Sequence, residues 1–170
     1  VLVNGASGTV GSAAVQLARH IGAHVTGVCS TANADLVRAL GADAVIDYKA
    51  ADFARIGTRW DVILDTVGNV SFARCRKALN KNGRLLLAVG GLGDLLKAPF
   101  QSMASGLKVA GGPAPERAQD IVELKRLCEI GAYKPVIDSR FAFDRTSEAH
   151  ARVDSDRKVG SVVVTMRDVR

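Results

Sequence analysis

The beginning of the chain combines a short apolar segment, a glycine-rich turn and an amphipathic helix. Residues 1–3 form the apolar segment, and glycines follow at Gly5, Gly8 and Gly11. Apolar residues then recur with the period of one helix face. They are Val10, Ala13, Ala14, Leu17, Ala18 and Ile21. A strand, a glycine turn and a helix in this order are the context in which such a motif indicates dinucleotide binding.

Each part of this motif has a physical role in the predicted phosphate site. A tight turn needs backbone angles that glycine adopts at low cost. A Cβ atom at Gly8 would hold a diphosphate away from the main chain, whereas Gly11 lets the helix lie close to the strand. The first N–H groups of the helix would point at the anion, favoured by the helix dipole. The predicted ligands are Ala6, Ser7, Gly8, Thr9, Val10 and Gly11. A glycine-rich turn without a ligand is the alternative interpretation of the motif alone.

Length and composition exclude several classes of protein. The 170 residues fit one large domain, or one domain with a piece of another, and a hydrophobic fraction of 48% supports a sizeable core. No apolar run is long enough to cross a membrane. The net charge is +6, but the basic cluster at residues 74–84 lacks interleaved aromatic residues. We interpret it as a solvated helix face, and we expect a small-molecule substrate and neither a nucleic-acid nor a membrane partner.

The cysteine and histidine positions favour a reduced protein without a metal site. Cys29, Cys75 and Cys128 are far apart and match no zinc or disulfide spacing. His20 and His24 have the spacing of a helical metal pair, but a Gly-Ala turn separates them. We therefore expect a cytoplasmic protein and assign no metal ligand. The chain begins inside a predicted strand, so we also expect a segment to precede it in the parent protein.

Strand and helix patterns alternate along the first part of the chain. Strands are predicted at residues 1–3, 24–29, 44–46, 61–65, 84–89 and 107–110, and helices after the glycine turn and at residues 34–40, 52–55, 71–80 and 114–131. Continuous apolar strands that alternate with helices are typical of a parallel sheet covered on both faces. Residues 92–105 are expected to form a mobile loop with a short helix. The prediction is an α/β fold, a doubly wound Rossmann sheet of about six strands.

The pattern changes after Gly131. Apolar segments at residues 135–137, 141–143 and 162–165, with a short helix at 145–153, do not continue the alternation. We expect residues 1–132 to form the dinucleotide-binding domain, and residues 133–170 to be a tail that joins another sheet.

Six segments carry a resemblance to a known family. They are residues 4–11, 40–48, 61–69, 83–85, 89–91 and 134–137. In this order they resemble the cofactor-binding domain of the medium-chain dehydrogenase/reductases, in the branch of quinone oxidoreductases and zinc-free alcohol dehydrogenase-like proteins. The resemblance implies an N-terminal GroES-like catalytic domain, absent here, that carries much of the substrate pocket. The tail at residues 133–170 would belong to that domain.

Short-chain dehydrogenases begin with a similar strand and glycine turn. Their catalytic Tyr-x-x-x-Lys motif is not found in this chain. Tyr48 and Tyr133 are each followed directly by lysine, and neither has a lysine four residues later. We therefore set that family aside.

The end of the second predicted strand bears on the choice between NADP and NAD. An NAD site usually has an acidic residue there, about twenty residues after the glycines. This chain has Ser30 and Thr31, whose hydroxyls can donate to a 2′-phosphate that an acid would repel. We predict NADP, with Ser30, Thr31 and Asn33 near that phosphate; simple helix capping is the alternative role. The resemblance brings Tyr48 to the same phosphate, but it also expects a basic residue where this chain has Ala32, so NAD stays an option.

The turns after the fourth and fifth predicted strands complete the predicted cofactor groove. Ligands of this fold bind at the carboxyl edge of the sheet, where these turns lie. The predicted groove residues are Val67, Gly68, Val89, Gly90 and Gly91, the last three near the nicotinamide end. Glycines that only turn the chain are the alternative. Asp65 is interpreted as a cap of its strand.

The resemblance implies an NADP(H)-dependent oxidoreductase that transfers hydride to a quinone, enone or carbonyl. No residue of this chain is a convincing general acid, so no catalytic residue is assigned. Two alternatives stay open: a nucleotide-binding module without turnover, and a zinc-dependent alcohol dehydrogenase whose ligands lie in the missing part. A homodimer is a further option. We expect the chain alone to bind cofactor without appreciable turnover.

Overall fold

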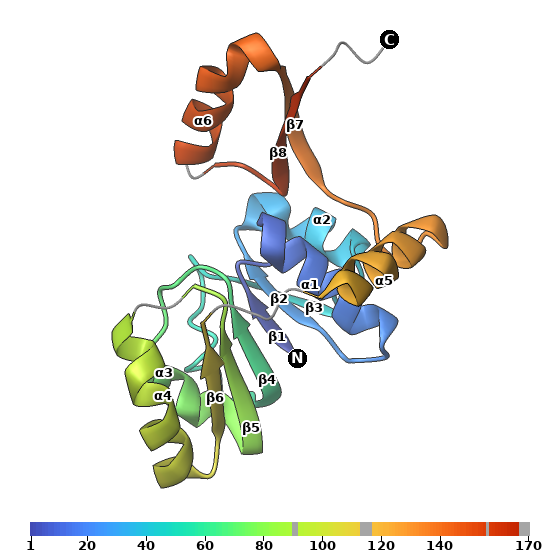
Figure 1. Cartoon of the computed structure of the whole chain (residues 1–170). Helices are drawn as coiled ribbons and strands as arrows, with labels where there is room; N and C mark the ends of the chain where they lie inside the picture. The colour runs from blue at the N-terminus through green and yellow to red at the C-terminus, as the bar shows by residue number, and fades with distance from the viewer. Residues whose placement is uncertain (90–91, 113–116, 156, 167–170) are drawn as a thin grey trace.

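The computed structural model describes residues 1–89, 92–112, 117–155 and 157–166 (Figure 1). Its strands are β1 (Leu2–Asn4), β2 (Thr26–Cys29), β3 (Ala44–Asp47), β4 (Trp60–Asp65), β5 (Leu79–Leu87), β6 (Lys108–Gly111), β7 (Ile137–Ala142) and β8 (Ser161–Thr165). Its α-helices are α1 (Thr9–His20), α2 (Ala34–Ala39), α3 (Phe72–Cys75), α4 (Leu92–Ser105), α5 (Ala118–Glu129) and α6 (Thr146–Asp154). Short 3₁₀ turns are η1 (Thr31–Asn33), η2 (Arg76–Ala78) and η3 (Phe143–Arg145).

Strands β1 to β6 form one parallel sheet in the order β3-β2-β1-β4-β5-β6. The chain starts in the middle of this sheet, moves to one edge, and returns to pair β4 with β1. This is the strand order of a doubly wound Rossmann sheet, so the predicted fold class is confirmed. The direction of winding reverses between β1 and β4. Sheets of this type bind ligands beyond the carboxyl ends of the strands at such a point.

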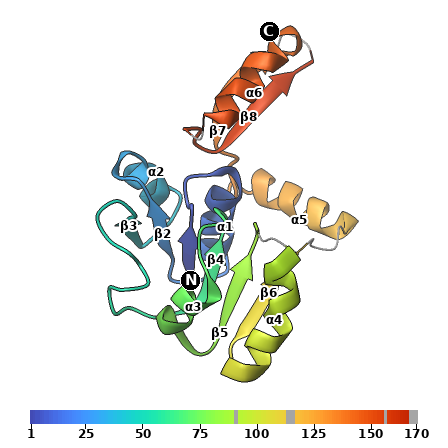
Figure 2. The same cartoon turned by 90° about the vertical axis from the view of Figure 1, so that its left-hand side faces the viewer.

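Neighbouring residues of β1 supply the two faces of the sheet. Leu2 is fully buried in a cluster with Ile63 of β4 and residues of α3. Val3 is fully buried in a second cluster with Val15 of α1 and Val37 of α2. Because successive strand side chains point to opposite faces, the continuous apolar strands require cover on both sides. Figures 1 and 2 show this arrangement, with α1 and α2 on one face and α3 and α4 on the other.

Residues 52–55 form a turn and not the predicted short helix. The Asp52 carboxylate accepts a hydrogen bond from the Ala54 N–H at 3.0 Å and from the Arg74 guanidinium at 2.9 Å. The bond from Arg74 holds the pKa of Asp52 below its usual value. A side chain that binds the backbone two residues ahead offers it an alternative to the helical hydrogen bond. The sequence prediction did not include this competition.

The predicted helix at residues 71–80 and the turn that follows it also differ from the structure. The helical turns end at Ala78, and β5 begins at Leu79. The turn predicted at 81–83 is an irregularity inside β5, where Asn82 has a φ of 62° and the register against β4 shifts. The extra residues of such a bulge have no partner in the neighbouring strand, so turn-forming residues occur without ending the strand.

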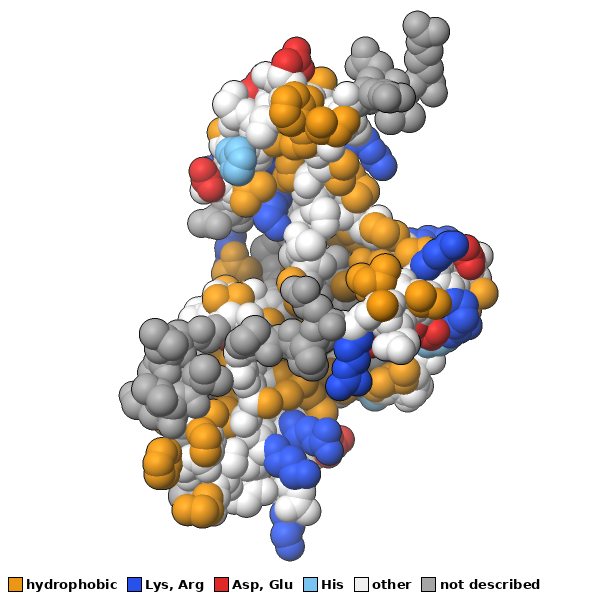
Figure 3. Space-filling model, in the orientation of Figure 1, with side chains coloured by type: hydrophobic (Ala, Val, Ile, Leu, Met, Phe, Trp, Pro, Cys, Tyr) orange, Lys and Arg blue, Asp and Glu red, His pale blue; other side chains and the backbone are white. Residues whose placement is uncertain are grey.

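Helices α4 and α5 were only partly anticipated. Helix α4 spans 14 residues although Pro99 lies inside it, and proline usually ends or kinks a helix. Helix α5 is present as predicted, but its apolar side, which contains Ile121, Leu124, Leu127 and Cys128, is only partly buried. Leu127 is buried, whereas Ile121 is 68% exposed and Cys128 is exposed. Figures 1 and 2 show α5 beside α1 at the rim of the domain, and hydrophobic side chains gather on this region in Figure 3.

The tail forms a separate two-stranded parallel sheet of β7 and β8, connected by α6. The sequence analysis expected no strand–helix alternation after Gly131, but the tail has the order strand, helix, strand within its own sheet. In Figures 1 and 2 this unit stands beyond the six-stranded sheet. In the part of the chain that the structure describes, no helix has the length and apolar character needed to cross a bilayer.

Asp138 is the polar centre of the tail. Its carboxylate accepts two hydrogen bonds from Arg152, at 2.6 and 2.8 Å, and one from the Val159 N–H at 2.9 Å. The bonds from Arg152 hold the pKa of Asp138 far below its usual range. Arg152 also donates to the carbonyl of Arg157, so this pair fixes the loop that leads into β8.

We expect Asp138→Asn to lower the free energy of unfolding at pH 7 by about 1.5–3 kcal/mol, the range for charge-assisted hydrogen bonds. The folded pKa is depressed, so the ionic contribution is present above the unfolded pKa of about 3.9 and fades as the pH falls below it. Melting curves of both proteins between pH 7 and pH 3 measure this. The difference between the two proteins should narrow below about pH 4; a constant difference would contradict the ionic assignment.

Candidate functional site

The turns after β1 and β4 pack directly on each other at the point where the winding of the sheet reverses. Gly5 has a φ of +83°, and a Cβ atom on it would lie 2.6 Å from both Thr66 Oγ1 and Val67 Cγ2. Thr66 Oγ1 in turn donates to the carbonyl of Asn4 at 2.7 Å. Both the backbone angle and the lack of space require glycine here. The two turns therefore act as one rigid corner.

Gly8 and Gly11 face different surroundings. A Cβ atom at Gly11 would lie 2.1 Å from the Gly5 carbonyl oxygen, whereas one at Gly8 would meet only the same oxygen at 3.4 Å. Gly11 thus permits a close contact of α1 with the turn after β1, where the sequence had predicted a close approach to the strand itself. Gly8 occupies the N-cap position of α1, with no side-chain cap, and a Cβ atom there would have open space around the rest of it.

The first turn of α1 has unused hydrogen-bond donors. The Ser12 N–H donates to the Gly8 carbonyl at 2.9 Å. The Thr9 N–H is taken up by the parallel bridge between Gly8 and Gly160, in which it faces the Gly160 carbonyl. Among the described residues, no acceptor is found for the N–H groups of Val10 and Gly11. The first turn also contains no acidic residue. Two free donors at a helix N-terminus, beside a position without a side chain, make a cradle that fits a diphosphate.

The residues predicted near the 2′-phosphate lie beside this cradle, at the carboxyl end of β2. Asn33 Nδ2 donates to Ser7 Oγ at 3.0 Å, which ties the glycine turn to η1. Ser30 is the N-cap residue of η1 but makes no side-chain capping bond. Tyr48 is exposed and close to the same strand end, because its N–H donates to the Cys29 carbonyl at 3.2 Å. The structure therefore brings these predicted residues together.

Asp47 is a charged neighbour that the sequence reasoning missed. It ends β3 in register with Cys29 of β2, and its carboxylate accepts a hydrogen bond from the Thr31 hydroxyl. This bond and one from the Lys49 N–H lower the pKa of Asp47. A carboxylate thus lies next to a predicted phosphate ligand. The pairing of β2 with β3 in this fold could have indicated it.

Asp65 is a strand-end cap, as the sequence reasoning favoured. Its fully buried carboxylate accepts hydrogen bonds from the N–H groups of Val67 and Gly68, both at 3.1 Å, and from Asn4 Nδ2 at 2.8 Å. Asn4 also donates to Asn69 Oδ1 at 2.9 Å. With three donors around it, this carboxylate holds the turn after β4 in shape.

The groove residues after β4 and β5 are neighbours. Gly68 has a φ of +81°, and a Cβ atom on it would lie 3.0 Å from Val89 Cγ1. Val67 and Val89 both expose about half of their side chains. They offer an apolar surface at the carboxyl edge of the sheet, next to the diphosphate cradle. Gly90 and Gly91 lie outside the described residues.

The loop before β8 also reaches the glycine turn, which the sequence reasoning did not foresee. The Gly160 N–H donates to the Ser7 carbonyl at 2.8 Å, and Gly160 forms an isolated parallel bridge with Gly8. Thr9 Oγ1 donates to the Gly160 carbonyl at 2.7 Å and accepts a hydrogen bond from Lys158 Nζ at 3.0 Å. The glycine at position 160 was the available signal, because its φ of +74° excludes most other residues.

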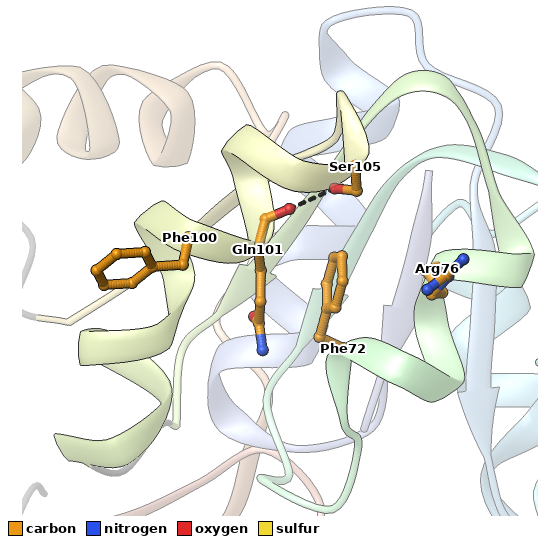
Figure 4. A pocket seen from close by; sticks show the side chains of 5 residues that line it. All are labelled: Phe72, Arg76, Phe100, Gln101 and Ser105. Atoms are coloured by element: carbon orange, nitrogen blue, oxygen red, sulfur yellow. Dashed lines mark hydrogen bonds between the residues drawn. The ribbon is translucent and has the colours of Figure 1, made fainter.

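A separate hollow of about 570 Å³ lies between α3, η2 and α4. Its lining residues are Phe72, Arg76, Phe100, Gln101 and Ser105. In Figure 4 the Phe100 ring points away from the Gln101 and Phe72 side chains. None of the predicted cofactor-binding residues lines this hollow, so we do not assign the candidate site to it.

No metal centre can be built from the residues that the structure describes, because no three His, Cys, Asp or Glu side chains gather there as ligands. Helix α1 ends at His20, so His24 does not share its face. These residues do not fit a zinc ion, and we derive no step through one.

The glycine contacts predict a clear contrast in stability. Gly11→Ala should lower the free energy of unfolding by about 1–3 kcal/mol, since its methyl group must displace the turn. The matched variant Gly8→Ala should stay within about 0.5 kcal/mol of the wild type. Chemical denaturation of the three proteins tests this. Equal stability of the two variants would show that α1 does not depend on the close approach.

Comparison with known proteins supports one family. Residues 40–164 match a family model described as zinc-binding dehydrogenase. The chloroplastic quinone oxidoreductase QR1 of Triphysaria versicolor is 33% identical over 175 residues, which cover 96% of this chain and 51% of that protein. The chain spans about half the length of the curated relatives it matches.

Solved structures share the fold. The quinone oxidoreductase from Coxiella burnetii aligns with a TM-score of 0.84 at 23% identity, over 98% of this chain and 52% of that one. A mycobacterial protein in complex with NADPH aligns with a TM-score of 0.77 at 26% identity, over 96% and 55% of the two chains. The first likeness concerns the fold alone.

Proposed function

We propose, from the premise that this chain belongs to the medium-chain dehydrogenase/reductase family, that it is the cofactor-binding part of an NADP(H)-dependent oxidoreductase. The observation that carries the proposal is the cradle at the start of α1. It combines the open space at Gly8 with the free N–H groups of Val10 and Gly11. A dinucleotide diphosphate is the ligand that such a cradle accommodates at this point of a Rossmann sheet.

The bound cofactor would supply the hydride that is transferred to a quinone, enone or carbonyl. The residues of this chain would bind and orient it. The cradle would hold the diphosphate, and the exposed side chains of Val67 and Val89 would exclude water beside the nicotinamide end. Asp65 already accepts three hydrogen bonds within the fold, so we assign it no proton transfer. The proton donor would come from the remaining length of the protein.

NADP(H) is the proposed cofactor and NAD(H) its competitor. The hydroxyl of Ser30 and the side chain of Asn33 lie at the end of β2, where an NAD site usually has an acid. The NADPH complex of the mycobacterial relative supports the same choice. Asp47 favours NAD(H) instead, because its negative charge beside Thr31 would repel the 2′-phosphate of NADP(H).

Replacement of Asp47 by a neutral residue should therefore increase the preference of the site for NADPH over NADH. Asp47→Asn keeps an oxygen that can accept from the Lys49 N–H and removes the charge. We expect the affinity for NADPH to rise by roughly threefold to tenfold, since one like charge at the edge of the site is lost. The affinity of the same variant for NADH is the internal control and should not change. Parallel changes for both cofactors would contradict a 2′-phosphate near Asp47.

We further propose that residues 1–132 are the cofactor domain and that residues 133–170 belong to the substrate-binding domain. The two-stranded sheet of β7 and β8 is only half-buried, which suits a sheet that more strands extend. A homodimer is part of the proposal. Strand β6 is an edge strand, and α4 beside it exposes 71% of Phe100 and 85% of Met103.

A cytoplasmic location belongs to the same proposal. Cys29, Cys75 and Cys128 are free thiols, which a reducing compartment maintains. Burial raises the pKa of the Cys75 thiol to about 11, so this side chain stays protonated and unreactive.

The central test is Gly8→Val. Its side chain should fill the cradle and abolish NADPH binding, while the open space around Gly8 leaves the fold intact. Titration of NADPH fluorescence measures the binding, and far-ultraviolet circular dichroism checks the fold. If the folded variant bound NADPH with unchanged affinity, the cradle would not be the diphosphate site and the proposed function would lose its main support.

Turnover by this chain alone is a separate measurement. We expect NADPH binding without appreciable oxidation when a quinone is added, followed by absorbance at the reduced-nicotinamide band. The expectation rests on the missing share of the substrate pocket, since the chain spans about half of its relatives. Robust quinone reduction would show that these residues suffice for catalysis.

A further inference from the structure

Lys158 places a positive charge beside the diphosphate cradle. Its Nζ atom donates to Thr9 Oγ1 at 3.0 Å and to the Gly160 carbonyl at 3.1 Å. Both acceptors are neutral. No carboxylate among the described residues pairs with this ammonium group. An ammonium group has three donors, so one N–H and the charge have no partner among the described residues.

The backbone around Lys158 is held firmly. On one side, the carboxylate of Asp138 accepts a hydrogen bond from the Val159 N–H at 2.9 Å. On the other, the Gly160 N–H donates to the Ser7 carbonyl at 2.8 Å. A Cβ atom on Gly160 would lie 2.3 Å from the Val136 carbonyl oxygen, so the loop fits only with glycine here. The ammonium group is therefore positioned before any ligand arrives, which reduces the entropic cost of binding.

The charge of a diphosphate exceeds what the helix N-terminus alone can balance, and Lys158 can supply the difference. A dinucleotide diphosphate carries about two negative charges, whereas a helix N-terminus supplies roughly half of a positive one. Thr9 is the first residue of α1, so Lys158 contacts the helix at the end where its free N–H groups lie. A cation here adds to the helix dipole and to the backbone donors.

We propose that Lys158 is the cationic ligand of the cofactor diphosphate, supplied by the tail to a cradle that the glycine turn builds. The inference rests on the proposed function and adds a residue to it. Lys158 would keep its contact with Thr9 and turn its remaining N–H toward a phosphate oxygen. The bound dinucleotide would then contact both the six-stranded sheet and the loop before β8.

The test compares Lys158→Gln with Lys77→Gln. Lys77 is an exposed residue of η2, before the start of β5 and so at the opposite edge of the sheet, and its replacement removes the same charge. Binding of NADPH and of ADP-ribose, which keeps the diphosphate but lacks the nicotinamide, is measured at low and high salt. Lys158→Gln should weaken both ligands about tenfold, the value of one charge-assisted hydrogen bond. Lys77→Gln should leave both affinities unchanged.

Two further readouts separate ligand binding from a purely structural role. The affinity of the wild type should fall more steeply with salt than that of Lys158→Gln, because the lost attraction is screened by ions. Lys158→Arg should restore most of the affinity. Equal affinities of the wild type and Lys158→Gln would overturn the inference alone. A wild-type chain that binds neither ligand would overturn the proposed function, and this assignment with it.

Discussion

The close approach of helix α1 to the turn after β1 determines the geometry of the whole candidate site. The backbone at Gly11 lies so near the Gly5 carbonyl that no side chain fits between them. This contact places the first helical N–H groups at the point where the sheet reverses its winding. The tight packing of Gly5 against Thr66 then brings the turn after β4 to the same corner. One contact between main-chain segments and one between the main chain at Gly5 and two side chains thus shape the corner at which the phosphate cradle lies.

Much of this arrangement was predictable because it depends on local patterns. The glycine spacing, the apolar strands and the helix period together predicted the sheet, and Asp65 was recognised as a cap from its place at a strand end. The contacts of Thr31 with Asp47 and of Thr9 with Lys158 were not predicted. Both join residues that lie far apart in the sequence. Their positions follow from strand register and from the path of the tail, which no local pattern encodes.

Helix assignments failed where tertiary contacts outweighed propensity. Arg74 binds Asp52 and stabilises a turn in place of a helix, whereas α4 forms although it contains Pro99. Ile121 of α5 is exposed although it belongs to the apolar side of that helix. The helical period of α5 was recognised correctly, but a period identifies an apolar face and not the surface that covers it.

The bonds from Gly160 to the glycine turn join two units whose sheets are otherwise separate. Thermodynamic linkage makes such a connection reciprocal. If a dinucleotide steadies the β7–α6–β8 unit, any partner segment that steadies this unit must tighten the dinucleotide by the same factor. Under the proposed function, any molecule whose binding steadies this unit would therefore slow the release of the dinucleotide.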